Sequence, residues 1–254
     1  MPVPGTDPGS KDPGSTDPGC PRSLAFGDLG YLELASASIS AFVLAGGQSR
    51  RMGQDKALLT LAGEPLIEHA LSILRNAGLS PVIAGARSDL SRFAPVIPDP
   101  DPDLGPLSGI CAALDSTSAP EFSFARYTVF LPIDLPLLPA SVISYLIHHA
   151  QITSAAVTVP SICGAANTFP AVLEQSVLPT LKSELAAGRR GCLAAFHTAA
   201  QVLGRPISII PVEHLAQSGQ AAHPRGLSAA LWLRNVNTPA DLSRVGRHFP
   251  SQIA

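Results

Sequence analysis

Ile39-Ser-Ala-Phe-Val-Leu-Ala-Gly-Gly47 is the stretch that decides the fold class. Its first part, Ile39–Leu44, has the length and the apolar character of a strand that is buried on both faces. The glycine pair that follows it marks a loop. Strands buried on both faces belong to parallel sheets, because the crossover connections place helices on each side. The stretch therefore predicts an α/β fold with a loop at the end of its first strand.

The rest of the chain continues this alternation of short apolar strands and amphipathic helices. We expect further strands at residues 81–84, 95–97, 127–131, 155–159 and 207–210. We expect helices at 65–77, 107–114, 141–150, 173–187, 191–199 and 239–247, the last of them capped by Thr238. The alternation is typical of a three-layer α/β/α sandwich around a mostly parallel, Rossmann-like sheet, in which ligands bind beyond the carboxyl ends of the strands.

The N-terminus has a different composition. Residues 6–20 contain three variants of one short repeat, Thr-Asp-Pro-Gly-Ser, Lys-Asp-Pro-Gly-Ser and Thr-Asp-Pro-Gly-Cys. Turn-forming residues without apolar partners cannot build a core, so we expect residues 1–37 to be a disordered tail and residues 38–254 to form one globular domain. A docking segment is the alternative to a dispensable extension, and no function follows from the repeat itself.

Composition narrows the function classes. The formal net charge of -2 argues against a broad basic surface for nucleic acid. No apolar run reaches the roughly 18 residues that a spanning helix needs, and no secretory signal is visible. The scattered cysteines give neither a zinc pattern nor a disulfide framework. We therefore expect a cytoplasmic protein that acts on small molecules, with no nucleic acid and no membrane as partner.

The loop after the first strand has the chemistry of a phosphate site. Gly46 and Gly47 allow close approach of backbone N–H groups to phosphate oxygens, and Arg50, Arg51 and Lys56 add three positive charges. Three cations on one loop offset the charge of a triphosphate or of departing pyrophosphate. A solvated basic turn is the alternative. The spacing matches neither the P-loop nor the dinucleotide-binding fingerprint.

The complete spacing, Leu44-Ala-Gly-Gly-x-Ser-x-Arg-Met-Gly-x-Asp-Lys56, resembles the signature loop of the molybdenum cofactor guanylyltransferase family. Members of that family transfer GMP from GTP to molybdopterin. The resemblance implies that the loop binds nucleotide and that two of its residues are catalytic. The implied nucleotide-binding residues here are Leu44, Ala45, Gly46, Gly47 and Lys56, and the implied catalytic ones are Arg51 and Lys56. Related cytidylyltransferases typically read Leu-Ala-Ala-Gly, so Gly46 favours guanine.

Two aspartates follow predicted strands. Asp134, in Leu131-Pro-Ile-Asp-Leu-Pro136, is the best candidate for a magnesium ligand, because magnesium prefers carboxylate oxygens and water. An exposed turn aspartate between prolines is the alternative. In the resembling family an aspartate at this place holds magnesium and contacts the nucleotide, which implies a metal-binding, nucleotide-binding and catalytic role for Asp134. Asp99 matches the other nucleotide-contacting aspartate, although its neighbours Asp101 and Asp103 leave the alignment open.

Further segments extend the resemblance to about residues 40–245. They are Gly105-Pro-Leu-Ser-Gly109, Phe169-Pro-Ala-Val172, Ala187-Gly-Arg-Arg190 and Asn235-Val-Asn-Thr-Pro239. Arg189 and Arg190 are candidates for the molybdopterin phosphate, with solvated helix charges as the alternative. Asn235 and Asn237 either line a pterin pocket or cap the last helix. The chain departs from the family at Ala84-Gly-Ala86, where an asparagine often contacts the nucleotide.

The sequence thus predicts a magnesium-dependent nucleotidyltransferase. Its substrates would be GTP and molybdopterin, its products pyrophosphate and molybdopterin guanine dinucleotide, and its partners molybdoenzymes or their chaperones. Two enzymatic alternatives stay open, a CTP-using molybdopterin cytidylyltransferase and a nucleotidyltransferase for another phosphorylated acceptor. A non-catalytic nucleotide-binding protein that delivers the cofactor is an alternative of another class.

Overall fold

The computed structural model describes residues 39–45, 55–85, 88–101, 104–117 and 125–249, all of which belong to one compact unit, residues 32–254. The predicted tail at 1–37 lies outside the described residues, so the domain boundary stays a prediction. The loop residues Gly46, Gly47, Arg50 and Arg51 lie outside them as well. None of the helices in the described ranges is long and apolar enough to cross a bilayer.

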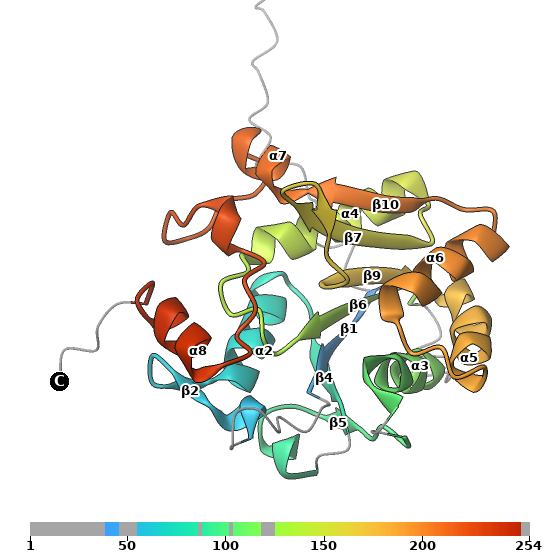
Figure 1. The fold of residues 1–254 in the computed structure, drawn as a ribbon, viewed down its shortest axis with the longest axis horizontal. Helices are drawn as coiled ribbons and strands as arrows, with labels where there is room; N and C mark the ends of the chain where they lie inside the picture. The colour runs from blue at the N-terminus through green and yellow to red at the C-terminus, as the bar shows by residue number, and fades with distance from the viewer. Residues whose placement is uncertain (1–38, 46–54, 86–87, 102–103, 118–124, 250–254) are drawn as a thin grey trace, which may run out of the picture. The chain divides into compact units, whose positions relative to one another are not determined.

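A mixed sheet forms the middle of this unit (Figure 1). The strand order is β10-β7-β9-β6-β1-β4-β5, with β8 paired to β7. The strands are β1 (Ile39–Leu44), β4 (Pro81–Ala84), β5 (Val96–Ile97), β6 (Tyr127–Pro132), β7 (Val157–Ile162), β8 (Ala165–Ala166), β9 (Ala171–Glu174) and β10 (Ile207–Pro211). The central strand β1 is parallel to β4 and β6, whereas β9 is antiparallel to β6 and β7. The mostly parallel sheet is therefore confirmed.

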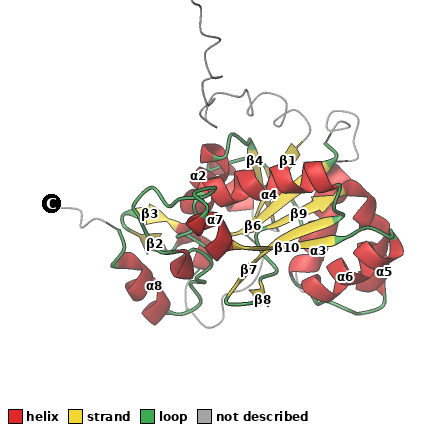
Figure 2. Ribbon diagram, turned by 90° about the horizontal axis from the view of Figure 1, so that it is seen from above, coloured by secondary structure: helices red, strands yellow, loops and turns green. Residues whose placement is uncertain are grey.

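Helices cover both faces of the sheet, as expected for three layers (Figure 2). On one face α2 (Leu66–Asn76) and α4 (Ala140–Thr153) pack in one apolar cluster with Val43 and Val129, which α7 (Val212–Gln217) also joins. On the other face α3 (Pro106–Ser116), α5 (Leu178–Ala186) and α6 (Cys192–Val202) pack with Phe42 and Phe130, whose ring centroids are 5.9 Å apart. Neighbouring residues such as Phe42 and Val43 face opposite layers because strand side chains alternate.

The predicted helix at residues 173–187 is wrong in its first part. Residues Ala171–Glu174 form β9, a 3-10 turn follows at Gln175–Val177, and α5 begins only at Leu178. Apolar spacing alone does not separate a short buried strand from a helix. Here β9 is fully buried between β6 and β7, and its backbone pairs with both, so strand pairing outweighs the helical spacing.

A third apolar cluster lies beside the main layers. A short hairpin, β2 (Thr60–Leu61) and β3 (Glu64–Pro65), was not predicted, and it delays the start of α2 to Leu66. The last helix, α8 (Pro239–Gly246), begins at the predicted cap Thr238. Side chains from these parts pack together as one cluster, which consists of Leu61, Leu66, Leu137, Val236 and Val245. The cluster joins the segment after Lys56 to the segment before α8.

The antiparallel strand β9 ends in a buried carboxylate, Glu174, which is 5% exposed. Arg126 Nε donates to its Oε1 at 2.9 Å, Ser176 Oγ donates to Oε2 at 2.5 Å, and Arg205 also pairs with Oε2. Burial alone would raise the pKa of Glu174, but the hydrogen bonds from Ser176, Arg205 and Arg126 outweigh it and lower the pKa. Because the pKa is lower in the folded than in the unfolded chain, the carboxylate stabilises the fold above the unfolded value, and this stabilisation disappears as the pH falls through the folded value.

We expect Glu174→Gln to reduce the free energy of unfolding by about 2–3 kcal/mol at pH 7. This lies below the usual loss for breaking a buried ion pair, because both arginines are partly exposed. The difference from wild type should shrink in acid, where the wild-type carboxylate is protonated as well. Urea unfolding between pH 7 and pH 3 measures this, and a difference that stays constant with pH would contradict the electrostatic explanation.

Candidate active site

Those residues predicted to bind nucleotide that the structure describes lie at or beyond the carboxyl ends of parallel strands. Leu44 ends β1 and is paired with Ala84 at the end of β4 and with Pro132 at the end of β6. Beyond the strands, the Ala45 N–H donates to Ala84 O at 3.1 Å, so the sheet pattern continues into the first residue of the loop. Asp134 follows β6 at the same edge of the sheet. This edge of the sheet is therefore the predicted nucleotide-binding edge.

Lys56 and Asp134 meet at this edge. Asp55 caps the 3-10 turn Lys56–Leu58 by accepting a hydrogen bond from the Ala57 N–H at 3.1 Å, which fixes the backbone that carries Lys56. The ammonium of Lys56 donates to Asp134 Oδ2 at 3.1 Å, and the side chains are only 16% and 18% exposed. Lys56 and Asp134, two of the three residues that the sequence predicts to be catalytic, thus form a partly buried ion pair.

A third residue, Asn237, joins this pair from the far end of the chain. Its Oδ1 accepts a hydrogen bond from Lys56 Nζ at 2.8 Å. The Val236 N–H donates to the backbone oxygen of Asp134 at 2.9 Å, which holds the segment against the active edge. The sequence predicts Asn237 as a pterin-pocket residue or a helix cap, and its contact with Lys56 was not predicted. Asn235 precedes it in the same segment and is exposed.

Asp134 has a second oxygen that suits a cation. Its Oδ1 is buried and has no hydrogen-bond partner within the described residues. A buried anionic oxygen without a partner is costly, and a metal ion removes that cost. The described parts of the chain contain no cluster of three His, Cys, Asp or Glu residues that could hold a metal. Magnesium matches this sparse donor set, because it commonly takes one or two carboxylates and completes its shell with water and phosphate oxygens.

Asp99 lies at another place on the edge and has structural partners of its own. It is 8% exposed, and its Oδ1 accepts from Ser108 Oγ at 2.7 Å and from the Asp101 N–H at 3.0 Å. It therefore ties the end of β5 to the first turn of α3, and Ser108 is a partner that the sequence did not reveal. Between β6 and β5 the sheet has three inter-strand steps, so the strand ends that precede Asp134 and Asp99 are separated by roughly 14 Å.

The turn into α3 depends on glycine. Gly105 has φ 83° and ψ -170°, a region that essentially only glycine adopts. A Cβ at Gly109 would stand 3.5 Å from Asp99 Oδ2, in ordinary contact. The segment Gly105-Pro-Leu-Ser-Gly109 thus opens a helix whose N-terminus lies next to the buried carboxylate. The nucleotide contact of Asp99 stays a prediction.

Arg189 is engaged within its own helix end. Its Nε and Nη2 donate to the two carboxylate oxygens of Glu184, each at 2.6 Å, and its backbone N–H donates to Glu184 O at 2.9 Å. Arg190, next to it, is exposed. Figures 1 and 2 show α5, which precedes both arginines, at the opposite end of the sheet from α8. The structure does not bring the arginines and the asparagine segment together, and their role in molybdopterin binding stays a prediction.

Comparisons with known proteins identify relatives of this chain. The chain is 32% identical over 214 residues to the probable molybdenum cofactor guanylyltransferase of Carboxydothermus hydrogenoformans, a match that covers 84% of this chain and 97% of that protein. It is 41% identical over 110 residues to molybdenum cofactor guanylyltransferase of Xanthomonas euvesicatoria pv. vesicatoria. This second match covers 43% of this chain and 53% of that relative, about half of its length.

A solved structure shows the same fold. The crystal structure of molybdopterin-guanine dinucleotide biosynthesis protein A from Archaeoglobus fulgidus aligns with a TM-score of 0.63 at 24% identity, over 82% of this chain and 97% of that one. Residues 41–224 match the family model of the MobA-like NTP transferase domain, a range that contains Lys56, Asp99 and Asp134 but ends before Asn237. The chain belongs to the MobA-like NTP transferase family, as its first loop predicts.

Proposed function

We propose that the protein transfers GMP from GTP to molybdopterin, releasing pyrophosphate and forming molybdopterin guanine dinucleotide. The observation that carries this proposal is the contact between Lys56 Nζ and Asp134 Oδ2 at the carboxyl edge of the sheet, beside a buried Asp134 Oδ1 without a partner in the described residues. The pair places a cation and an anion side by side at this edge, and a phosphate substrate with a metal ion needs one of each. The relatives named above supply the choice of substrates.

The reaction needs positioning and charge stabilisation rather than a general base. A phosphate oxygen of molybdopterin attacks the α-phosphorus of GTP, and a new phosphorus–oxygen bond forms. The bond from the α-phosphorus to the oxygen that bridges to the β-phosphate breaks, and its electron pair leaves with pyrophosphate. The attacking phosphate is already anionic at neutral pH, so no proton has to be removed from it. Negative charge grows on the departing oxygens.

Lys56 is placed to meet that charge. An ammonium has three N–H donors, and two of them are directed to Asp134 and Asn237, which leaves the third for a phosphate oxygen. Asp134 would hold magnesium through its carboxylate, and the ion would neutralise negative charge on the phosphates. We propose that Arg51 and the N–H groups of Gly46 and Gly47, all outside the described residues, contribute further positive charge. Asp99 would contact the nucleotide from the end of β5.

The full chain with molybdopterin, magnesium and either GTP or CTP tests this function. We expect one pyrophosphate per guanine dinucleotide formed and little reaction with CTP. Transfer of CMP without transfer of GMP would refute the guanine assignment. Pyrophosphate release only with a different phosphorylated acceptor would replace molybdopterin, and GTP binding without any release would indicate a non-catalytic delivery protein.

A further inference from the structure

The position of the Lys56 ammonium depends on Asn237, whose backbone is held by hydrogen bonds. Lysine has a long, flexible side chain with many rotamers, so one contact to Asp134 does not fix the direction of its remaining donors. The second contact, from Lys56 Nζ to Asn237 Oδ1 at 2.8 Å, removes that freedom. Asn237 is exposed, so packing does not hold its side chain in place.

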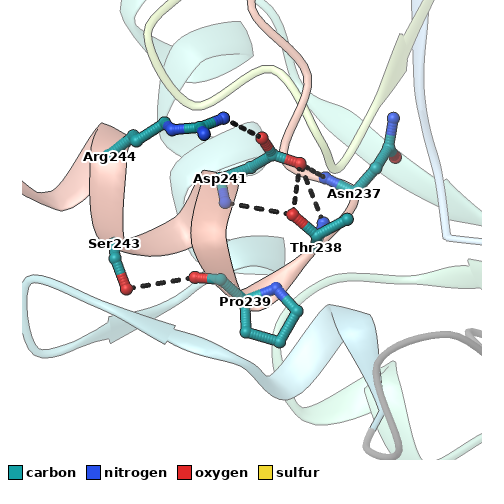
Figure 3. Close-up of polar contacts among 6 residues, drawn as sticks. All are labelled: Asn237, Thr238, Pro239, Asp241, Ser243 and Arg244. Carbon is teal, nitrogen blue, oxygen red and sulfur yellow. Dashed lines mark hydrogen bonds and ion pairs between the residues drawn. The ribbon is translucent and has the colours of Figure 1, made fainter.

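Hydrogen bonds on both sides of Asn237 hold its backbone. On one side, the N–H of the fully buried Val236 donates to Asp134 O at 2.9 Å. On the other side, Asp241 Oδ2 accepts from the Asn237 N–H at 3.3 Å and from the Thr238 N–H at 3.0 Å. Figure 3 shows the Asn237 N–H facing Asp241, while its side chain points away from α8. Asp241 therefore anchors the residue that orients Lys56.

Helix capping accounts for only part of this arrangement. The capping box of α8 consists of the Thr238 side chain on the Asp241 N–H, at 3.1 Å, and the Asp241 carboxylate on the Thr238 N–H. The carboxylate also reaches one residue further back, to Asn237, which precedes the cap. The contact of Asp241 with the Asn237 N–H does not satisfy an N–H group of the helix. It instead holds the backbone of the residue whose side-chain oxygen accepts from Lys56.

We propose that Asp241 is a positioning residue for nucleotidyl transfer, which acts on Lys56 through Asn237. This inference rests on the proposed function. Without Asp241, Asn237 Oδ1 is no longer held in place and the free donor of Lys56 loses its direction. Because Lys56 meets charge that grows mainly in the transition state, the loss falls on kcat more than on the KM for GTP.

The test compares substitutions on one helix. We expect Asp241→Ala to lower kcat about tenfold, with a change in the KM for GTP of less than about threefold. Asp241→Asn keeps an acceptor for the Asn237 N–H and should retain most of the activity. Arg244→Ala and Ser243→Ala are matched controls, because Arg244 contacts Asp241 at Oδ1, at 3.5 Å, rather than at the oxygen that accepts from Asn237, and Ser243 donates to Pro239 O at 3.1 Å. Neither should change kcat.

A double-mutant cycle separates positioning from capping. In an Asn237→Ala background, Asp241→Ala should still lower the Tm but should cause no further loss of kcat, because the link to Lys56 is already gone. A lower Tm with an unchanged kcat in the single variant would overturn the inference, and so would two independent losses of kcat in the double variant.

One readout does not depend on the proposed activity. In protein labelled with ¹⁵N-lysine, the Lys56 ammonium resonance, assigned by its absence in Lys56→Met, should shift or broaden in Asp241→Ala and stay unchanged in Arg244→Ala. An unchanged resonance in Asp241→Ala overturns the inference even if transfer occurs. If wild-type protein releases no pyrophosphate from GTP and molybdopterin, while the Lys56 resonance still shifts in Asp241→Ala, the proposed function is refuted and the link from Asp241 to Lys56 stays intact.

Discussion

Lys56→Met is expected to lower pyrophosphate release at saturating GTP by about 10³-fold, with the protein still folded. The substitution removes the only charge of the side chain and keeps most of its length. The transition state then loses a donor that lies 3.1 Å from Asp134 Oδ2 in a partly buried site, where charge interactions are stronger than in water. Steady-state rates of wild type and variant, followed with a coupled pyrophosphate assay, measure the effect.

The chain offers a matched control for this experiment. Lys182 pairs with Asp115 at 2.7 Å, but both side chains are at least half exposed, so Lys182→Met removes the same charge from a pair that contributes little. Its activity should equal that of wild type. Near-normal turnover of Lys56→Met, in protein with an unchanged circular dichroism spectrum, would remove Lys56 from the mechanism.

Asp134→Asn is expected to reduce the rate by a similar factor, on the order of 10³, and to raise the magnesium concentration needed for half-maximal rate. Asparagine keeps the shape of the side chain and an oxygen that accepts from Lys56, so the fold should persist. In wild type, the buried Oδ1 of Asp134 belongs to a carboxylate and lacks a partner in the described residues. In Asp134→Asn this group is a neutral amide, which is a weaker magnesium ligand. Rates measured across a magnesium titration give both quantities.

Asp115→Asn is the corresponding control, since it removes a carboxylate from the exposed pair with Lys182. It should leave both the rate and the magnesium dependence unchanged. If Asp134→Asn shows the same magnesium dependence as wild type, the carboxylate does not hold the ion, whatever happens to the rate. A loss of rate together with a large loss of Tm would indicate that Asp134 supports the fold instead.

The main strands and the active edge are predictable because their signals are local. Ile39–Leu44 and Tyr127–Pro132 are apolar runs that end in loops, and the structure has both as central parallel strands. The positions of Lys56 and Asp134 on the edge follow from their places after these strands. Their meeting, 78 residues apart in sequence, follows from the strands being neighbours in the sheet.

The less predictable features depend on contacts that no local pattern records. The contact between Lys56 and Asn237 joins residues that are 181 positions apart, and it requires the packing of Val236 beside the hairpin. The strand β9 resembles the start of a helix in sequence and is decided by its neighbours in the sheet. The pairing of Arg189 with Glu184 is local, and the sequence still does not decide it, because a helix end and a ligand site attract the same residues.

The antiparallel direction of β9 also determines the length of the sheet edge at which Lys56 and Asp134 lie. Because β9 is antiparallel to β6 and to β7, the strands β7 and β10 regain the direction of β1, and their carboxyl ends open onto the edge where Asp134 lies. From β5 to β10 the edge spans six inter-strand steps, about 29 Å. We predict that the proposed transfer passes through a ternary complex, with both phosphorylated substrates bound along this edge, rather than through a ping-pong exchange with a modified enzyme.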